Sequence, residues 1–136
     1  MKTIREEVEL TVRGGPATAG LCDVLLLLAR DSIQVLASSS YRERTGPVHL
    51  LVTTAPAKAQ ALLSEDGYTC KVTDVIVVAM PEYRPGELAQ LWCELAADKI
   101  GIICSYISML RDRGYCAVFK TTDNHQAARI LATAAN

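Results

Sequence analysis

The chain has 136 residues and a net charge of −1, which excludes the basic surface that general nucleic-acid binding requires. Half of the residues are hydrophobic and 21% are charged, so the chain can bury a core and the composition excludes a disordered protein. Its five cysteines form no Cys-x-x-Cys pair and have no histidine at ligand spacing, which excludes the usual zinc motifs and a disulfide framework.

The first half of the chain alternates strand and helix patterns. Val8 to Val12 alternates apolar and polar residues, as a half-buried strand does, and Gly14-Gly15-Pro16 ends it. Leu21, Val24 and Leu28 then recur at helical spacing. The predicted elements of this half are a strand at 8–12, a helix over 21–28, strands at 33–39 and 48–53, a helix over 56–64 and a strand at 69–80.

The second half repeats this order but ends one strand early. Pro85 and Gly86 precede a helix with Leu88, Leu91 and Leu95 on one face. The predicted elements are a helix over 87–98, strands at 100–109 and 115–120, and a helix capped by Asp123 or Asn124 that runs to about residue 135. The second copy has no obvious fourth strand of its own.

The two halves also match residue by residue. The halves align at a shift of 67 residues, which becomes 68 after one inserted residue. Apolar, glycine and threonine positions then coincide: Leu21, Val24, Leu28, Gly46, Thr53 and Thr54 fall on Leu88, Leu91, Leu95, Gly114, Thr121 and Thr122. The order βαββαβ followed by βαββα is the split βαβ, ferredoxin-like arrangement. We predict an α+β protein with two such modules, residues 1–72 and 73–136, with antiparallel sheets and the helices on one face of each sheet.

One segment of the second half resembles a known family. Arg84-Pro85-Gly86-Glu87-Leu88-Ala89-Gln90-Leu91, followed by Leu95-Ala96 and Ile100-Gly101-Ile102, resembles the start of an ACT domain. From about Glu7 to Ala135 the chain is similar to the small stand-alone tandem ACT proteins. The resemblance implies a regulatory or allosteric protein that binds an amino acid at the loops between first strand and first helix and at the module interfaces, and that is not an enzyme.

The resemblance also implies where the ligand lies. ACT domains bind amino acids at the loop between the first strand and the first helix, where a glycine lets the ligand approach the backbone and the helix N-terminus receives a carboxylate. Ala19 lies where the second copy has Gly86, and Thr18 where it has Pro85, so we expect the second loop to be the better site. The candidate positions are Tyr83, Arg84, Pro85, Gly86, Glu87 and Leu88 in the second copy, and Gly14, Gly15, Thr18 and Ala19 in the first.

Partners and location follow from the same patterns. Sheet edges need cover, and the second copy lacks a strand, so we expect a homodimer. Any regulated enzyme would act in trans. The N-terminus, Met1 to Glu9, lacks an apolar signal core, and the longest apolar run, Val24 to Ala29, is too short to span a bilayer. We therefore expect a cytoplasmic protein with no membrane segment, no metal and no cofactor.

Two alternatives remain open from the sequence. The RNA-recognition module shares the βαββαβ order, and Arg113-Gly114-Tyr115 begins like its base-stacking strand, although Ala117 and Lys120 do not fit the later stacking positions. A small ferredoxin-like enzyme would need a cavity against the sheet lined by Tyr106, Tyr115 and a histidine. Neither His49 nor His125 has a nucleophile at a telling spacing.

Overall fold

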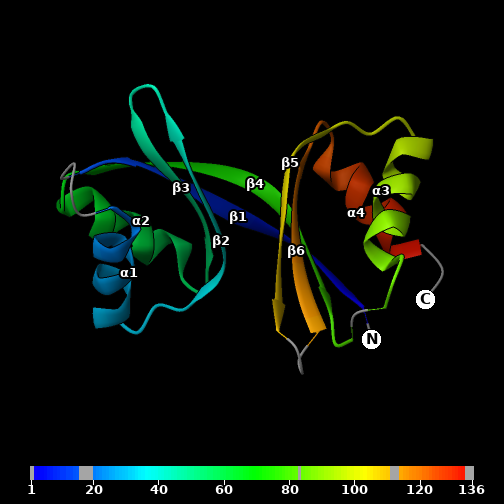
Figure 1. Ribbon diagram of the computed structural model, residues 1–136, viewed down its shortest axis with the longest axis horizontal. Helices are drawn as coiled ribbons and strands as arrows, with labels where there is room; N and C mark the ends of the chain where they lie inside the picture. Colours follow the sequence, from blue (N-terminus) through cyan, green and yellow to red (C-terminus); the bar gives the residue numbers. More distant parts are fainter. Residues whose placement is uncertain (1, 16–19, 83, 111–113, 134–136) are drawn as a thin grey trace. The chain divides into compact units, whose positions relative to one another are not determined.

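The computed structural model describes residues 2–15, 20–82, 84–110 and 114–133. The chain divides into two compact units (Figure 1). The first unit is Val8–Thr73. The second unit combines Met1–Glu7 with Asp74–Asn136, so it joins the two ends of the chain.

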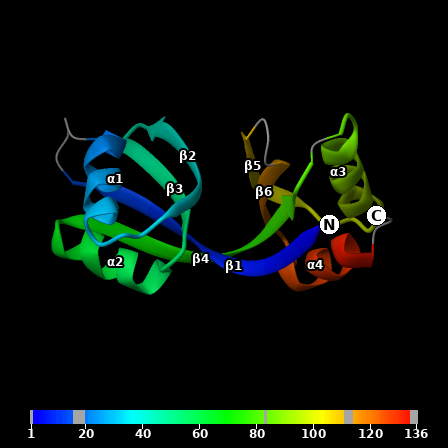
Figure 2. The same ribbon diagram turned by 90° about the horizontal axis from the view of Figure 1, so that it is seen from below.

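Four strands and two helices build the first unit. Its sheet has the order β2-β3-β1-β4, and α1 and α2 cover one face of it (Figure 2). Leu10 of β1 pairs with Leu51 of β3, and both belong to the core between the sheet and the helices. The elements are β1 (Thr3–Gly14), α1 (Gly20–Arg30), β2 (Val35–Glu43), β3 (Gly46–Thr53), α2 (Pro56–Glu65) and β4 (Tyr68–Met80).

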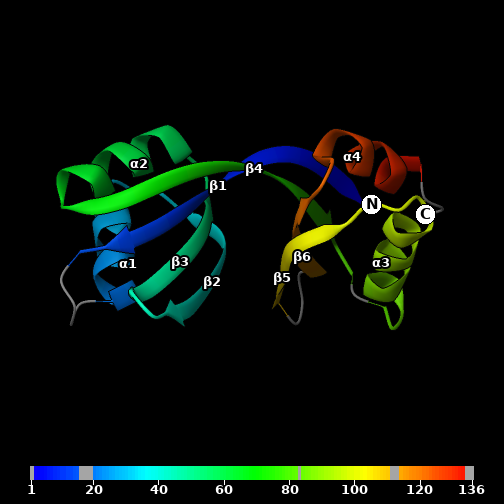
Figure 3. The same ribbon diagram turned by 90° about the horizontal axis from the view of Figure 1, so that it is seen from above.

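The second unit repeats this plan. Its strands have the order β1-β4-β6-β5, and α3 and α4 lie on one side of β5 and β6 (Figure 3). Its core contains Ile76 and Val78 of β4, Leu91 and Leu95 of α3, and Phe119 of β6. The remaining elements are α3 (Glu87–Ala97), β5 (Ile102–Leu110), β6 (Gly114–Thr121) and α4 (Asn124–Thr133). The predicted α+β fold of tandem ferredoxin-like modules is confirmed.

The N-terminal segment supplies the strand for which the second half of the sequence shows no signal. β1 and β4 both belong in part to each unit, and Ile4, near the start of β1, packs against the core of the second unit. The modules predicted from the sequence, residues 1–72 and 73–136, differ from the two units chiefly in this segment. A missing strand is therefore no longer a reason to expect a dimer.

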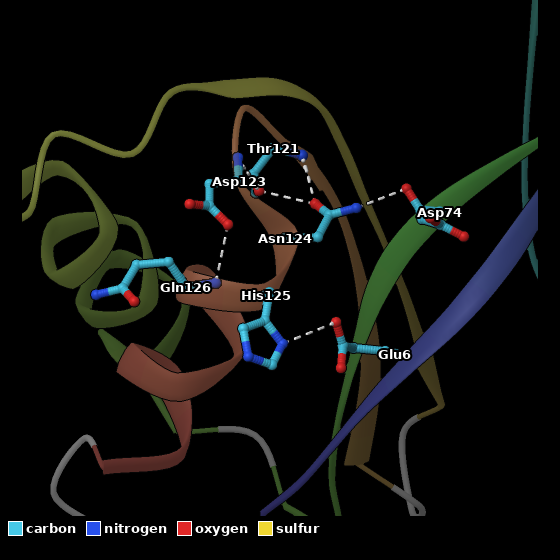
Figure 4. Close-up of polar contacts among 7 residues, drawn as sticks. All are labelled: Glu6, Asp74, Thr121, Asp123, Asn124, His125 and Gln126. Atoms are coloured by element: carbon cyan, nitrogen blue, oxygen red, sulfur yellow. Dashed lines mark hydrogen bonds and ion pairs between the residues drawn. The ribbon is translucent and has the colours of Figure 1, made fainter.

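A polar network ties α4 to the strands of the second unit (Figure 4). The amide nitrogen of Asn124 donates to the backbone oxygen of Asp74 on β4 at 2.7 Å, and its oxygen accepts from the Thr121 hydroxyl at 2.7 Å. Asp123, not Asn124, caps the helix, because its Oδ1 accepts the backbone N–H of Gln126 at 3.1 Å. His125 lies 3.8 Å from Glu6 of β1.

The internal repeat extends to irregularities of the backbone. The β2–β3 register shifts between Val35 and Ala37, and the β5–β6 register shifts between Ile102 and Cys104. The residues inside these shifts, Leu36 and Ile103, are themselves 67 positions apart. Such bulges bend a strand and disturb its pairing. The same deviation at equivalent places in both units supports a common plan for the two copies.

None of the helices in the described part of the chain is both long and apolar enough to cross a membrane.

Replacing Ile4 with alanine tests the role of the N-terminal segment. We expect Ile4→Ala to lower the free energy of unfolding by about 1–2 kcal/mol, since it removes a partly buried side chain from the core of the second unit. Arg5→Ala is the matched control, because the Arg5 side chain is 58% exposed and its ion pair with Glu7 lies at the surface. Urea denaturation measures both changes. Equal stabilities of the two variants would contradict this role.

Candidate functional site

The second unit contains a cavity of about 460 Å³ at the start of α3. This volume lies within the range of roughly 300–1,000 Å³ that is common for small-molecule sites. The loop between β4 and α3 forms one wall of the cavity, and residues 87–94 of α3 contribute to another. The lining combines apolar and charged side chains: Lys2, Met80, Arg84, Pro85, Gly86, Glu87, Gln90, Leu91, Glu94 and Tyr115.

Gly86 shapes the entrance to α3. It is the N-cap residue with φ +91°, a left-handed conformation that side-chain-bearing residues rarely adopt. A glycine cap has no side chain to accept the free backbone N–H groups of the first helical turn. Glu87 binds the loop instead, since its carboxylate accepts the backbone N–H of Arg84 at 3.1 Å. The positive end of α3 therefore faces the cavity with room for an anionic ligand group.

Two residues further along α3 form the polar wall of the cavity. Gln90 Nε2 donates to Glu94 Oε1 at 3.1 Å. The other oxygen, Glu94 Oε2, is buried and has no hydrogen-bond partner among the described residues. Lys2 and Arg84 also line the cavity, and Arg84 lies 3.4 Å from Glu82 at the surface. The site thus presents groups of both charges, as a zwitterionic ligand requires.

The structure brings four of the predicted site residues together. Arg84, Pro85, Gly86 and Glu87 all line the cavity. Leu88 instead packs against the core of the second unit, because it lies on the apolar face of α3. Tyr83 lies outside the described residues.

Sequence reasoning missed the rest of the lining. Gln90 and Glu94 lie four positions apart on α3, a spacing that places two polar side chains on one helix face and could have indicated them. Lys2, directly before β1, carries no such signal, because it reaches the cavity only through the fold. The sequence indicates Tyr115 only as a candidate for RNA stacking or for a catalytic cavity.

In the first unit a tyrosine lies against Gly15, the residue that follows β1. Tyr68, the first residue of β4, is buried, and its hydroxyl donates to Asp23 Oδ2 at 2.6 Å. Asp23 is the counterpart of Gln90 at the 67-residue shift. Burial and the hydrogen bond to Asp23 raise the pKa of Tyr68 above its ordinary value. The Tyr68 ring also lies so close to Gly15 that any side chain there would collide with it.

The first-copy candidates therefore lie at a different and smaller opening. Gly14 and Gly15 line a cavity of about 190 Å³ beside the turn between β2 and β3. Arg13, which shares this cavity, is paired with Glu43 at 3.0 Å. Thr18 and Ala19 lie outside the described residues.

The arrangement of histidines and cysteines gives little support to the catalytic alternative. His49 is buried in β3, with its Nδ1 2.8 Å from the Ser40 hydroxyl, and neither His49 nor His125 lines either cavity. Burial raises the pKa of the Cys70 and Cys116 thiols, which makes them poor nucleophiles. The described part of the chain holds no cluster of metal-ligating side chains.

The RNA alternative requires exposed aromatic rings on β6. Tyr115 and Phe119 of this strand are instead buried in the core of the second unit. A buried ring cannot stack on a base, so the strand lacks the platform of an RNA-recognition module. Arg113 lies outside the described residues.

The comparisons with known proteins agree with this fold. A family model described as an ACT domain pair matches residues 9–135. Nothing matches among curated protein sequences. Protein BT0572 from Bacteroides thetaiotaomicron has a similar structure, with a TM-score of 0.83, 19% identity, and coverage of 95% of this chain and 88% of that one.

Two other similar structures come from aspartate kinases. The ligand-free regulatory subunit of the Thermus thermophilus enzyme aligns with a TM-score of 0.67 and 14% identity, covering 99% of this chain and 97% of that one. Aspartokinase III of E. coli, in complex with lysine and aspartate, aligns with a TM-score of 0.53 and 18% identity over 95% of this chain. This chain spans only 30% of that enzyme. At these identities the likeness shows the fold.

The pH dependence of stability tests the buried state of His49. Burial lowers the pKa of His49 below 6.5, so below that pH the unfolded chain binds more protons than the folded one and stability falls as the pH falls. We expect His49→Gln to show a smaller loss of stability than the wild type between pH 7.5 and roughly 5.5 in urea denaturation. Equal losses in the two proteins would contradict a buried neutral His49.

Proposed function

The chain belongs to the ACT domain pair family, and on this basis we propose that it is a non-catalytic regulatory protein that binds an amino acid in the cavity of the second unit. The observation that carries the proposal is the position of this cavity. It opens at the loop between β4 and α3, which the resemblance to ACT domains identifies as the ligand loop.

The chemistry of the cavity supports an amino acid in particular. The uncapped start of α3 at Gly86, together with Lys2 and Arg84, suits a carboxylate. Glu87 and Glu94 provide negative charge for an ammonium group. Met80 and Leu91 add apolar surface that a ligand side chain can cover. A molecule with both charges and a carbon chain that extends from them to its end meets all of these requirements.

We propose one such site in each chain. In the first unit Tyr68 and Asp23 satisfy each other, and Gly15 packs against the Tyr68 ring. A ligand there would have to displace a buried tyrosine and break a hydrogen bond to a carboxylate, which costs about 1.5–3 kcal/mol on its own. The second unit offers its cavity without such a cost.

The proposed output is control of an enzyme. Several proteins of similar structure are described as regulatory subunits or domains of aspartate kinases. By analogy, ligand binding would change how this chain contacts a partner enzyme acting in trans. The cytoplasmic location stays a prediction.

We also propose that the chain forms a homodimer through α1. Leu25 and Leu26 on this helix are 38% and 56% exposed, although leucine is normally buried. Adjacent exposed leucines on one helix form an apolar surface that a second copy can cover.

A screen of the twenty amino acids by thermal shift tests the proposed ligand class. A ligand that binds only the folded state stabilises it by about 2.7 kcal/mol at a hundredfold excess over its Kd, so the melting temperature should rise by several degrees for one amino acid or a related group. The same melting temperature with all twenty would contradict amino-acid binding.

Gly86→Val tests the position of the site. Valine at φ +91° strains the backbone and places a branched side chain at the cavity entrance, so we expect the thermal shift to be lost. Gly67→Val is the matched control, because Gly67 has φ +92°, equally open space at its Cβ position and no part in either cavity. Gly67→Val should lower the basal melting temperature but keep the ligand-induced shift. A shift that survives in Gly86→Val would mean that the ligand binds elsewhere.

Sedimentation velocity tests the dimer. We expect the wild type to sediment as a dimer and Leu26→Glu as a monomer, since a charge in an apolar interface is costly to bury. Ser64→Glu, which places the same charge at an exposed position of α2, should remain dimeric. A monomeric wild type, or a dimeric Leu26→Glu variant, would exclude a dimer through α1.

A further inference from the structure

Glu94 is a carboxylate at a position where the repeat has a hydrophobic residue. At the 67-residue shift Glu94 falls on Leu27, which packs against the core of the first unit. The neighbouring positions keep their character, since Leu91 and Leu95 fall on Val24 and Leu28 and all four are buried. The two helices therefore differ at one inward-facing position, and the second helix has a negative charge there.

The surroundings of Glu94 leave half of its carboxylate without a partner. Oε1 accepts a hydrogen bond from Gln90 at 3.1 Å, which fixes the orientation of the group. Oε2 is shielded from solvent and has no partner among the described residues. A charged oxygen that is buried without a partner is costly, and a small shift of the carboxylate toward the cavity that Glu94 lines would let a ligand donor relieve this cost.

The distance between the two ends of the cavity limits the ligand. Eight residues separate Gly86 from Glu94 on one helix, which corresponds to about 12 Å along the helix axis. The Glu94 side chain leans toward the helix N-terminus and shortens this gap by a few ångströms. The α-ammonium of an amino acid is only one carbon away from its carboxylate, so it cannot bind Glu94 while the carboxylate lies at the start of α3. A cation at the end of a longer side chain can reach Glu94 while the ligand carboxylate lies at the start of α3.

We propose that the cavity selects an amino acid whose side chain ends in a cation, with Glu94 as the specificity-determining residue. The ligand carboxylate lies at the start of α3, the carbon chain lies along Leu91 and Met80, and the terminal cation pairs with the Glu94 carboxylate. Gln90 acts as a positioning residue for Glu94. This inference rests on the proposed amino-acid site and narrows its ligand to one class.

Titration calorimetry on the full chain tests the selection. The probes are lysine, ornithine and arginine, with norleucine as the neutral analogue of lysine and glutamate as an acidic amino acid. We expect at least one cationic probe to bind about tenfold or more tighter than norleucine, since a hydrogen bond to a charged group contributes about 1.5–3 kcal/mol. Glutamate should bind more weakly than norleucine.

Variants at Glu94 assign the selection to this residue. Glu94→Gln should reduce the preference for the cationic probe over norleucine to less than about threefold, and Glu94→Leu, which installs the residue of the first copy, should reverse it. Glu65→Gln, which neutralises an exposed carboxylate at the end of α2, should leave the preference unchanged. A folded Glu94→Gln variant is recognised by its wild-type affinity for norleucine.

The outcomes separate this inference from the proposed function. Equal affinities for norleucine and the cationic probes would overturn the selection while the amino-acid site stands. A preference that survives in Glu94→Gln would overturn the role of Glu94. No binding of any amino acid would overturn both proposals.

Discussion

Completion of the second unit by the N-terminal part of β1 is the constraint on which the rest of the structure depends. An exposed strand edge is a liability, and in the second unit the N-terminal part of β1 covers the edge of β4. Ile4 adds to the core of the second unit, and Lys2 reaches its cavity by the same route. The fold and the candidate site therefore both depend on the contact between the N-terminal segment and the rest of the second unit.

The same constraint explains why two related units carry unequal sites. Each unit is completed by a strand that begins near the ligand loop, β1 in the second unit and β4 in the first. β4 begins with Tyr68, whose ring packs against Gly15 and whose hydroxyl donates to Asp23. Directly before β1, Lys2 lines the cavity of the second unit. Differences at a few strand and helix positions thus give the two copies different surroundings at equivalent places.

Local patterns predicted the helices, the strands, the repeat and the Arg84–Glu87 part of the candidate site. The position of the N-terminal segment could not be predicted, because Thr3 to Glu7 shows no period that distinguishes one sheet from another. Trp92 follows the apolar spacing of α3, yet it is 42% exposed and meets the Phe119 ring in a T-shaped arrangement with the ring centroids 6.3 Å apart. Lys2 and Tyr68 join their sites through contacts between residues far apart in sequence, which periodicity does not encode.

Amide chemical-shift mapping by NMR, with the most stabilising amino acid as titrant, tests the central claim of one open site per chain most directly. The predicted result is a set of shifts at the cavity of the second unit, in the residues Gly86, Glu87, Gln90, Glu94 and Tyr115, and unchanged signals from Gly14 and Gly15. Shifts confined to Gly14 and Gly15, or of equal size at both loops, would contradict the account.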